Sequence, residues 1–332
     1  MQFKLEVIIL TEGGENIGFG HITRCLSLYQ AFEEKGIIPE FIVNGDKSIL
    51  GLLSDKRYRI FNWVKEKEYL FNYIENADIV IIDSYLAKRD IYNRISKLVK
   101  VPVYIDDSKR LNYPKGIVVN GSIYAEELDY PKNNEITYLL GMKYALLRKE
   151  FWEVPKKEIK EEIESVMVTF GGNDMCNMTP RILKLLIEQF PGLKKNVVIG
   201  KSFKNIREIE NLKDNNTKLF YHPDAETMKN IMLESDIAIS AAGQTLYELA
   251  RIGVPTIAIA ITDNQINNIK GWAKTGFIEY AGWWNGKNIL NNINNCLDKI
   301  KCFQLRKEKN LKEILHIDRK GSLRIVESIL KK

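Results

Sequence analysis

The sequence predicts an α/β protein built from two doubly wound domains, each with a parallel sheet. Three observations lead to this prediction. Short apolar runs alternate with amphipathic stretches along the whole chain, which is typical of parallel α/β proteins. The chain has 332 residues, enough for two domains of ordinary size. A charged segment that contains a proline, residues 153–164, interrupts the alternation near the middle. We therefore expect domains at residues 1–152 and 165–332, joined by this linker.

Five strands are expected in the first domain. Their apolar runs lie at residues 5–10, 39–43, 77–83, 101–106 and 116–120. A helical stretch follows the first run, and its apolar face comprises Ile22, Leu26, Tyr29 and Phe32. Gly36 follows this stretch, at a position where glycine commonly ends a helix.

The second domain repeats the alternation with six expected strands, each followed by a helix. The strands lie at residues 165–170, 196–200, 217–221, 236–240, 255–261 and 277–281, and the charged tail 310–332 is expected to be helical. Ligands of open α/β sheets bind outside the carboxyl ends of the strands. Two such domains in tandem therefore predict a binding cleft that faces the carboxyl ends of both sheets.

Composition and charge exclude several classes of protein. The net charge is only +6, and Lys and Glu are interspersed, whereas a nucleic-acid-binding protein concentrates its positive charge. No apolar run reaches the roughly 18 residues that span a bilayer, and the N-terminus has no signal-peptide pattern. We expect a cytoplasmic monomer without membrane insertion. The four cysteines form no CxxC pair, so neither a metal site nor a disulfide is predicted.

The first glycine-rich loop, TEGGENIGFGH (residues 11–21), lies between the first strand and the first helix. Gly18 and Gly20 allow close approach of a ligand, but the third glycine of the dinucleotide-binding motif is missing. His21 follows at the helix start, where the helix dipole disfavours a second positive charge. We therefore expect a neutral imidazole that accepts a proton, and we interpret His222 and His316 as structural.

Two further strand ends in the first domain carry acidic residues. Asp83 ends the third expected strand, and it either caps the next helix or orients a catalytic group. Asp106 and Asp107 end the fourth strand. Neighbouring residues of an extended chain point apart, so we interpret this pair as a turn and a cap and not as a metal site.

The second domain has two glycine turns after strands. Gly171 and Gly172, followed by Asn173, form the first. The second is Gly243 with Gln244 and Thr245 at a helix start, where free backbone N–H groups bind a diphosphate. Glu248 lies one turn into this helix and is expected to accept hydrogen bonds from ribose hydroxyls, and the amides of Asn264 and Gln265 follow the next strand.

Taken in order, these motifs resemble one known family. The resemblance rests on the segments IGFGHITRCLSL (17–28), IDSY (82–85), IDD (105–107), LLGMKYALLRKEF (139–151), TFGGND (169–174) and ISAAGQTLYELARIGVPTIAIAITDNQ (239–265). Together they resemble the UDP-2,4-diacetamido-2,4,6-trideoxy-β-L-altropyranose hydrolases of the pseudaminic-acid pathway and the SpsG-type spore coat polysaccharide biosynthesis proteins. The first and last segments are also similar to MurG-like glycosyltransferases, which implies the GT-B fold of two Rossmann-like domains.

The resemblance implies metal-independent, inverting hydrolysis of a UDP-sugar to free sugar and UDP, in nonulosonic acid or surface polysaccharide biosynthesis, without a cofactor. His21 matches the motif histidine and would activate the attacking water. Tyr85 and Asn264 would hold the sugar or the water. The implied binding residues are Gly18, Gly20, Arg24, Gly171, Gly172, Asn173, Gly243, Gln244, Thr245, Glu248 and Gln265.

The chain also departs from the hydrolase pattern, and two other functions stay open. Leu10, Thr11 and Glu12 replace the Arg-x-Asp of the hydrolase, which makes this segment similar to the SpsG-type branch. One alternative is a glycosyltransferase that uses the same donor with an acceptor hydroxyl. A basic stretch would suit a membrane-bound acceptor, and it comprises Lys47, Lys56, Arg57 and Arg59. The other alternative is a non-catalytic nucleotide-sugar binding protein.

Overall fold

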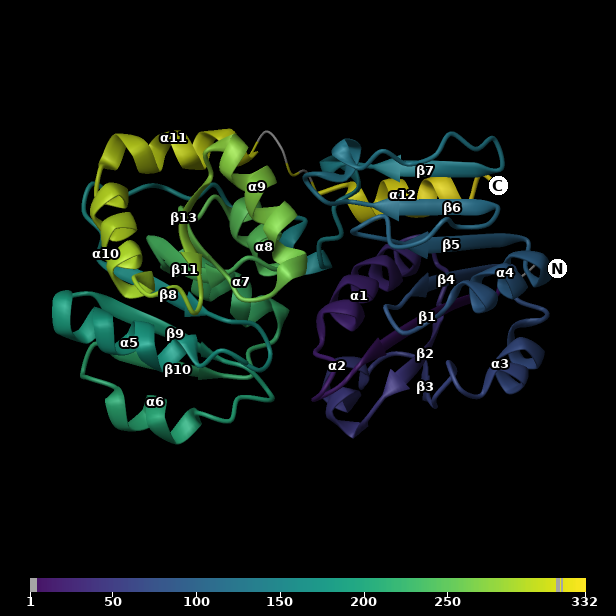
Figure 1. The fold of residues 1–332 in the computed structure, drawn as a ribbon, viewed down its shortest axis with the longest axis horizontal. Coiled ribbons are helices and arrows are strands. Elements are labelled where there is room, and N and C mark those ends of the chain that lie inside the picture. Colours follow the sequence, from purple (N-terminus) through teal and green to yellow (C-terminus); the bar gives the residue numbers. More distant parts are fainter. Residues whose placement is uncertain (1–4, 315–316, 318) are drawn as a thin grey trace. The chain divides into compact units, whose positions relative to one another are not determined.

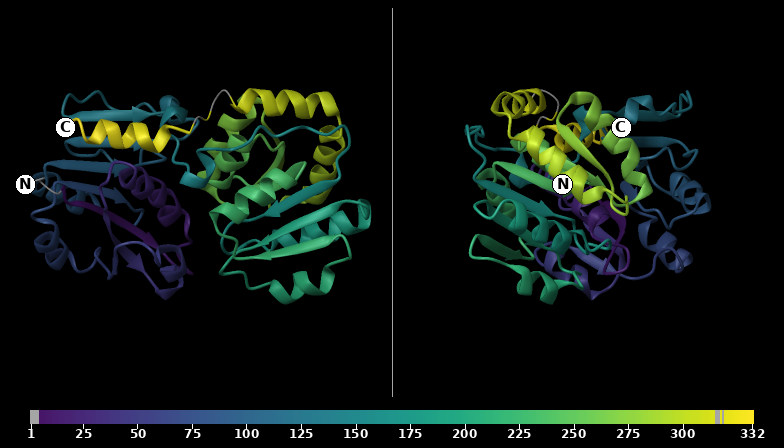
Figure 2. Two further views of the ribbon diagram at one scale, coloured as in Figure 1. Left: turned by 180° about the vertical axis from the view of Figure 1, so that it is seen from behind. Right: turned by 60° about the vertical axis from the view of Figure 1, so that its left-hand side comes forward.

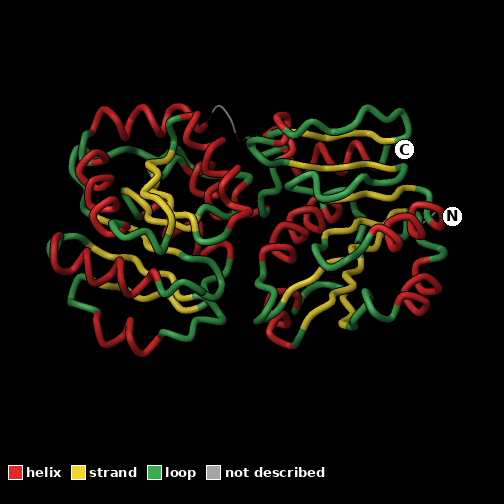
Figure 3. Tube along the Cα trace, viewed as in Figure 1, coloured by secondary structure: helices red, strands yellow, loops and turns green. Residues whose placement is uncertain are grey.

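The named strands form two sheets, and all of their pairings are parallel (Figure 1). The computed structural model describes residues 5–314, 317 and 319–332. The chain divides into two units: unit 1 comprises Met1–Lys149 and Arg319–Lys332, and unit 2 comprises Glu150–Asp318. Each unit contains one sheet with helices on both of its faces (Figure 3). The prediction of two doubly wound α/β domains is confirmed.

Unit 1 has a seven-stranded sheet in the order β3-β2-β1-β4-β5-β6-β7. Its strands are β1 (Val7–Gly13), β2 (Glu40–Gly45), β3 (Tyr58–Ile60), β4 (Ile79–Asp83), β5 (Val101–Ile105), β6 (Gly116–Asn120) and β7 (Ile136–Leu140). Its α-helices are α1 (Gly20–Glu33), α2 (Leu50–Leu53), α3 (Lys67–Ile74), α4 (Arg89–Leu98) and α12 (Gly321–Ile329). The five predicted strands are confirmed, and β3 and β7 are additional.

Both additional strands lie at the edges of the sheet of unit 1. The three residues of β3 are half-buried or exposed, and β7 is only partly buried. The three residues of β3 are too few to form an apolar run, whereas β7, with the sequence ITYLL, has such a run and was not assigned as a strand. The central strand β4, by contrast, is buried at all five positions.

Unit 2 has a six-stranded sheet in the order β10-β9-β8-β11-β12-β13. Its strands are β8 (Ser165–Thr169), β9 (Lys194–Ile199), β10 (Thr217–Tyr221), β11 (Ile237–Ala241), β12 (Thr256–Ala260) and β13 (Ile278–Trp283). Its α-helices are α5 (Met178–Gln189), α6 (Ile206–Leu212), α7 (Ala225–Glu234), α8 (Thr245–Ile252), α9 (Ile266–Thr275), α10 (Ile289–Ile300) and α11 (Phe303–Ile314). All six predicted strands are present, and an α-helix follows each of them.

The core of unit 1 explains which strand residues face α1. Ile8, Leu10 and Ile82 pack with α3 and α4 in one apolar cluster. Side chains alternate between the faces of a strand, so the residues between them point to the opposite face. Tyr29 of α1 stacks on Phe41 of β2 there, with ring centroids 5.2 Å apart. Asp83 follows Ile82 in β4, so its side chain points to this second face, where α1 packs.

The end of α1 matches the sequence prediction. Gly36 has a φ of +74°, and its N–H donates to the carbonyl of Glu33. The N–H of Ile37 donates to the carbonyl of Phe32. This pair of hydrogen bonds is the Schellman motif, in which glycine takes up the left-handed conformation at no steric cost.

The C-terminal helix differs from the predicted domain division. The sequence assigned residues 319–332 to the second domain, whereas α12 belongs to unit 1 and packs beside α1 (Figure 2). It buries Ile325, Val326 and Ile329. A Cβ atom at Gly321 would lie 2.1 Å from the carbonyl oxygen of Ala145, so this contact requires glycine. Local periodicity predicts a helix but not the surface on which the helix packs.

The predicted linker, residues 153–164, is part of unit 2. The buried guanidinium of Arg306 donates to the carbonyls of Lys160 and Glu161, at 2.8 and 2.6 Å. It also donates to the carbonyls of Ile300 and Lys301 at the end of α10. Arg306 thereby fixes the segment against unit 2. Among the described residues, no helix is both long and apolar enough to cross a membrane.

Candidate functional site

A closed loop places His21 at the start of α1. Gly14 and Gly18 exchange two backbone hydrogen bonds, of 3.1 and 2.7 Å, across the predicted glycine loop. Gly18 has a positive φ of +89°, a backbone conformation that favours glycine. A Cβ atom at Gly18 or at Gly20 would meet no other atom within 4 Å, so both glycines border open space. The helix begins at Gly20, and His21 lies in its first turn.

His21 is hydrogen-bonded to Asp83, the last residue of β4. The imidazole Nδ1 lies 2.7 Å from Asp83 Oδ1, and both side chains are buried. An ionised carboxylate only accepts hydrogen bonds, so we assign the proton to Nδ1. The lone pair on Nε2 is then available to accept a proton, as in the histidine–aspartate pairs of hydrolytic enzymes. Asp83 does not cap α4, so of the two sequence interpretations the orienting one agrees with the structure.

Arg24, one turn further along α1, neutralises two carboxylates. Its Nε donates to Asp83 Oδ2, its Nη2 donates to Asp83 Oδ1, and its Nη1 lies 3.0 Å from Asp107 Oδ2. Burial alone would raise the pKa of Asp83, but Arg24 and His21 outweigh it and hold this pKa well below its usual range. Burial likewise opposes the charge of Arg24, yet Asp83 and Asp107 raise its pKa above the ordinary value. Arg24, predicted to bind substrate, therefore forms ion pairs within unit 1.

Glu12 approaches the other nitrogen of the imidazole from the end of β1. Its Oε1 lies 3.7 Å from His21 Nε2, and the residue is only 1% exposed. The backbone N–H of Tyr85 donates to the same oxygen at 2.7 Å, and the Ser84 hydroxyl donates to Oε2. Glu12, which belongs to the segment that departs from the hydrolase pattern, therefore places a carboxylate beside His21.

Tyr85 connects His21 to Asp107. Its ring meets the imidazole edge-on, with centroids 4.6 Å apart, and its hydroxyl donates to Asp107 Oδ2. Asp106, by contrast, accepts the backbone N–H groups of Asp107, Ser108 and Arg110. The turn-and-cap interpretation therefore agrees with the structure for Asp106 and is wrong for Asp107.

These side chains form one group, which we call the His21 cluster. Its members are Glu12, His21, Arg24, Asp83, Tyr85 and Asp107. With a neutral imidazole, three carboxylates face one guanidinium, so the cluster suits proton acceptance and the stabilisation of positive charge. His21, Arg24 and Tyr85 were predicted from the sequence, and an orienting role was open for Asp83, whereas Glu12 and Asp107 were missed. Their common signal is that each ends or follows a strand of a parallel sheet.

The first glycine turn of unit 2 is fixed by Asp174. This carboxylate accepts the backbone N–H groups of Met178 and Thr179 at the start of α5, both at 2.9 Å. Gly171 is in the left-handed conformation with φ at +70°. A Cβ atom there would meet no other atom within 4 Å, so this predicted binding residue borders open space. Asn173 is half-buried next to it.

The second glycine turn of unit 2 leads directly from β11 into α8. Gln244 precedes the helix, which begins at Thr245, and the side chain of Gln265 is the nearest atom to a Cβ atom built on Gly243, at 3.8 Å. Gln265 Oε1 accepts the backbone N–H of Ile261 at 3.0 Å. The turn and Gln265 thus lie together at the carboxyl end of the sheet, as predicted.

The two other residues predicted for this part of unit 2 differ in exposure. Glu248 lies in the first turn of α8 and is 4% exposed. Asn264 is exposed, and its side-chain oxygen accepts the Thr262 hydroxyl at 2.6 Å. His222, interpreted as structural, has a left-handed backbone in the β10–α7 loop, and His316 lies outside the described residues.

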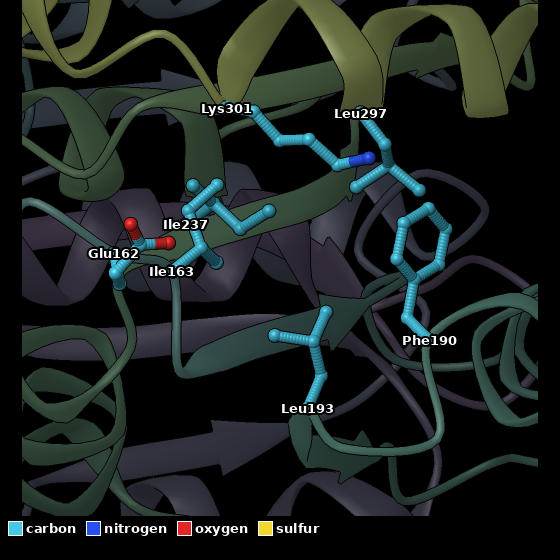
Figure 4. A pocket seen from close by; sticks show the side chains of 7 residues that line it. All are labelled: Glu162, Ile163, Phe190, Leu193, Ile237, Leu297 and Lys301. Atoms are coloured by element: carbon cyan, nitrogen blue, oxygen red, sulfur yellow. The ribbon is translucent and has the colours of Figure 1, made fainter.

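A separate cavity of about 150 Å³ lies at the opposite end of the sheet of unit 2 (Figure 4). It is mainly apolar and is lined by Glu162, Ile163, Phe190, Leu193, Ile237, Leu297 and Lys301. Ile163, Leu193 and Ile237 lie at the amino ends of β8, β9 and β11. None of the predicted site residues lines this cavity. Within the part of the chain that the structure describes, no group of three or more His, Cys, Asp or Glu side chains is arranged to hold a metal ion.

Comparison with protein families and solved structures agrees with this architecture. Residues 166–319 match the glycosyltransferase family 28 C-terminal domain. The chain is also similar to MurG of Acinetobacter baumannii, with a TM-score of 0.69 and 15% identity over 98% of this chain and 100% of that chain. At this identity the likeness shows the fold.

Three relatives resemble this chain more closely in sequence. The uncharacterised protein MJ1062 of Methanocaldococcus jannaschii is 26% identical over 77% of this chain, which spans 55% of that relative's length. The UDP-2,4-diacetamido-2,4,6-trideoxy-β-L-altropyranose hydrolase of Campylobacter jejuni is 26% identical over 83% of this chain and 99% of the relative. The spore coat polysaccharide biosynthesis protein SpsG of Bacillus subtilis is 23% identical over 82% of each.

Proposed function

We propose that this chain, which has the GT-B fold and belongs to the family of SpsG and the altropyranose hydrolase, hydrolyses a UDP-linked amino or deoxy sugar. The products would be the free sugar and UDP, within nonulosonic acid or surface polysaccharide biosynthesis. The observation that carries the proposal is the His21–Asp83 pair, because it supplies a base for water. The name of the Campylobacter relative supports a substrate of the 2,4-diacetamido-2,4,6-trideoxy type.

In this proposal, unit 2 binds UDP and unit 1 acts on the sugar. In unit 2, the turn Gly243–Thr245 presents backbone N–H groups at the start of α8, and we assign the diphosphate to it. The buried Glu248 in the same helix would contact the ribose. In unit 1, the His21 cluster would act on the sugar. The family 28 match to residues 166–319, essentially unit 2, supports this division.

The chemistry follows from the cluster. His21 Nε2 would take a proton from water while the water oxygen attacks the anomeric carbon. The bond to UDP breaks, and its electron pair leaves on the phosphate oxygen, where backbone N–H groups stabilise the charge. Positive charge that develops on the sugar ring would be stabilised by the carboxylates of the cluster. Attack from the face opposite UDP inverts the anomeric carbon.

A single incubation tests the proposal. The protein is mixed with UDP-2,4-diacetamido-2,4,6-trideoxy-β-L-altropyranose in ¹⁸O-labelled water without an acceptor alcohol. We expect UDP release, ¹⁸O in the sugar and not in UDP, an inverted anomer in the first NMR spectra, and no effect of a chelator. UDP release only after addition of an acceptor would instead indicate a glycosyltransferase. Binding of the nucleotide sugar without any release of UDP would indicate a binding protein.

One observation weakens the case for a membrane-bound acceptor. Three of the four basic residues that suggested a membrane-facing patch are in ion pairs within unit 1. Lys56 contacts Glu33, and both Arg57 and Arg59 contact Glu40. Glu33 offsets the charge of Lys56, and Glu40 offsets one of the two arginine charges, so this stretch attracts an anionic surface less strongly than its sequence suggests.

A further inference from the structure

Glu12 is a buried carboxylate next to the catalytic nitrogen of His21, and the mechanism proposed above gives it no specific role. It is fully buried at the end of β1, on the side of the imidazole opposite Asp83. His21 is therefore flanked by two carboxylates, with Asp83 at Nδ1 and Glu12 facing Nε2. Arg24 of α1 and the phenol side chain of Tyr85 also face the His21 imidazole.

The contacts of Glu12 fix the direction of its carboxylate. The Tyr85 N–H donates to Oε1 at 2.7 Å, and the Ser84 hydroxyl donates to Oε2. In both contacts Glu12 is the acceptor. A carboxylate oxygen has a second lone pair, and Oε1 lies 3.7 Å from His21 Nε2.

This distance separates two acceptors. Because Asp83 binds the proton on Nδ1, a neutral His21 has only a lone pair at Nε2. Nε2 and Oε1 therefore repel each other unless a donor with two hydrogens lies against both. Water is such a donor, and hydrogen bonds of ordinary length reach one water from both atoms. A water held this way turns its oxygen lone pairs away from the two acceptors.

We propose that Glu12 is a further catalytic residue, which shares the attacking water with His21; this inference rests on the proposed hydrolysis. One hydrogen of the water passes to Nε2 as the oxygen bonds to the anomeric carbon and the bond to UDP breaks, with the electron pair leaving on UDP. The second hydrogen stays on the new sugar hydroxyl, bonded to Glu12 Oε1. After the transfer, Glu12 pairs with the protonated imidazole.

Turnover of two variants at position 12 tests the role of the carboxylate. Glu12→Gln keeps the size and one acceptor oxygen but loses the charge, and we expect turnover to fall about 10²- to 10³-fold, within the usual range for a positioned catalytic group. Glu12→Asp keeps the charge at a shorter reach and should lose only about tenfold. UDP affinity should stay unchanged in both. Glu40→Gln is the control, because Glu40 is a buried carboxylate at the amino end of the neighbouring strand β2.

A second measurement does not depend on turnover. The chain has three histidines, so the His21 imidazole is assigned in NMR spectra of ¹⁵N-histidine protein by its absence in His21→Asn. A carboxylate facing Nε2 stabilises the protonated ring, so the midpoint of the His21 titration should fall to lower pH in Glu12→Gln but not in Glu40→Gln. The acid limb of the turnover profile should move in the same direction. A purely structural role of Glu12 would move neither.

The outcomes separate this inference from the proposed function. Wild-type hydrolysis together with Glu12→Gln turnover within threefold of wild type would overturn the role of Glu12 and leave the function intact. An inactive Glu12→Gln with an unchanged His21 titration and a lowered unfolding temperature would also overturn it, in favour of a structural role. A wild type that never releases UDP to water would overturn the proposed function itself.

Discussion

Strands β4 of unit 1 and β11 of unit 2 occupy the same place in their sheets, each beside the first strand of its unit. Their registers also correspond, because Asp83 lies opposite Thr11 and Ser240 lies opposite Thr169. Asp83 binds an imidazole and a guanidinium, whereas the Ser240 hydroxyl donates only to the neighbouring carbonyl of Ala241. The same position in one fold therefore carries a charged group in unit 1 and a neutral one in unit 2.

The segments that follow these strands differ in the same way. Ser84 and Tyr85 follow β4, and they bind the carboxylates of Glu12 and Asp107. After β11 come Ala242 and Gly243, and α8 begins two residues later. At the carboxyl end of the sheet, unit 1 has interacting side chains, whereas unit 2 has a glycine turn that leads directly into a helix. This difference agrees with the proposed division, in which unit 1 carries out proton chemistry and unit 2 binds the anion, and the following predictions test that proposal.

The largest effect is expected from His21→Asn. Turnover should fall about 10²- to 10⁴-fold because the base for water is lost. UDP affinity, measured by calorimetry, should stay within about twofold, because we assign UDP to unit 2. The control is His222→Asn, since asparagine tolerates the left-handed backbone at that position. Near-normal turnover of His21→Asn would contradict the division.

Asp83→Asn should cost turnover about tenfold to a thousandfold, because the amide no longer selects the Nδ1–H tautomer of His21. It should also reduce the free energy of unfolding by about 3 kcal/mol, since the buried Arg24 loses one partner and keeps Asp107. Asp78→Asn, near the other end of β4, is the control. Equal stability of Asp83→Asn and Asp78→Asn would contradict the structural half of this prediction.

The stability effect of Asp83 should depend on pH in a defined direction. Its pKa is lower in the folded than in the unfolded chain, so its ionised form stabilises the fold. This contribution is complete above the unfolded pKa of about 4 and is lost as the pH falls below it. Thermal unfolding should therefore separate wild type from Asp83→Asn clearly at pH 7 and less at pH 3. A difference that grows toward acid pH would show the opposite sign.

A smaller, complementary effect is expected in unit 2. Glu248→Ala should weaken UDP binding by about 1–3 kcal/mol, the cost of losing hydrogen bonds to a charged group, with turnover at saturating substrate little changed. Glu226→Ala is the matched control, because Glu226 lies in the first turn of α7 in the same unit. Calorimetry that gives both variants the wild-type affinity would refute the ribose contact.

The smallest effect is expected at the basic stretch of unit 1. Arg59 is about half exposed and pairs with Glu40, so Arg59→Ala should change the free energy of unfolding by less than about 1 kcal/mol. UDP release in water should not change. Loss of activity with a vesicle-bound acceptor, and not in water, would favour the glycosyltransferase alternative.

Most helices and strands were predictable from the sequence, because the signals for them are local. The buried central strands appear as continuous apolar runs, and the face of α1 appears as a helical repeat ending at Gly36. The edge strand β3 was not predicted because its three residues are too few to form an apolar run, and β7 was missed although its sequence, ITYLL, is mainly apolar. The positions of His21 and of the turn at Gly243, each between a strand and a helix, were predictable from the sequence, and the roles assigned to them stay predictions.

The set of carboxylates that gathers around His21, Arg24 and Tyr85 depends on the tertiary structure. Glu12 and Asp83 are 71 positions apart in the sequence, and Asp107 follows 24 positions after Asp83. Parallel pairing of β1 with β4 and of β4 with β5 aligns their carboxyl ends, and α1 lies on the face to which Asp83 points. A shift of one residue in the register of β4 would turn the Asp83 side chain to the opposite face of the sheet. The same reasoning applies to α12, whose sequence predicts a helix. Its packing beside α1 depends on the close approach of Gly321 to Ala145, which a side chain at position 321 would prevent.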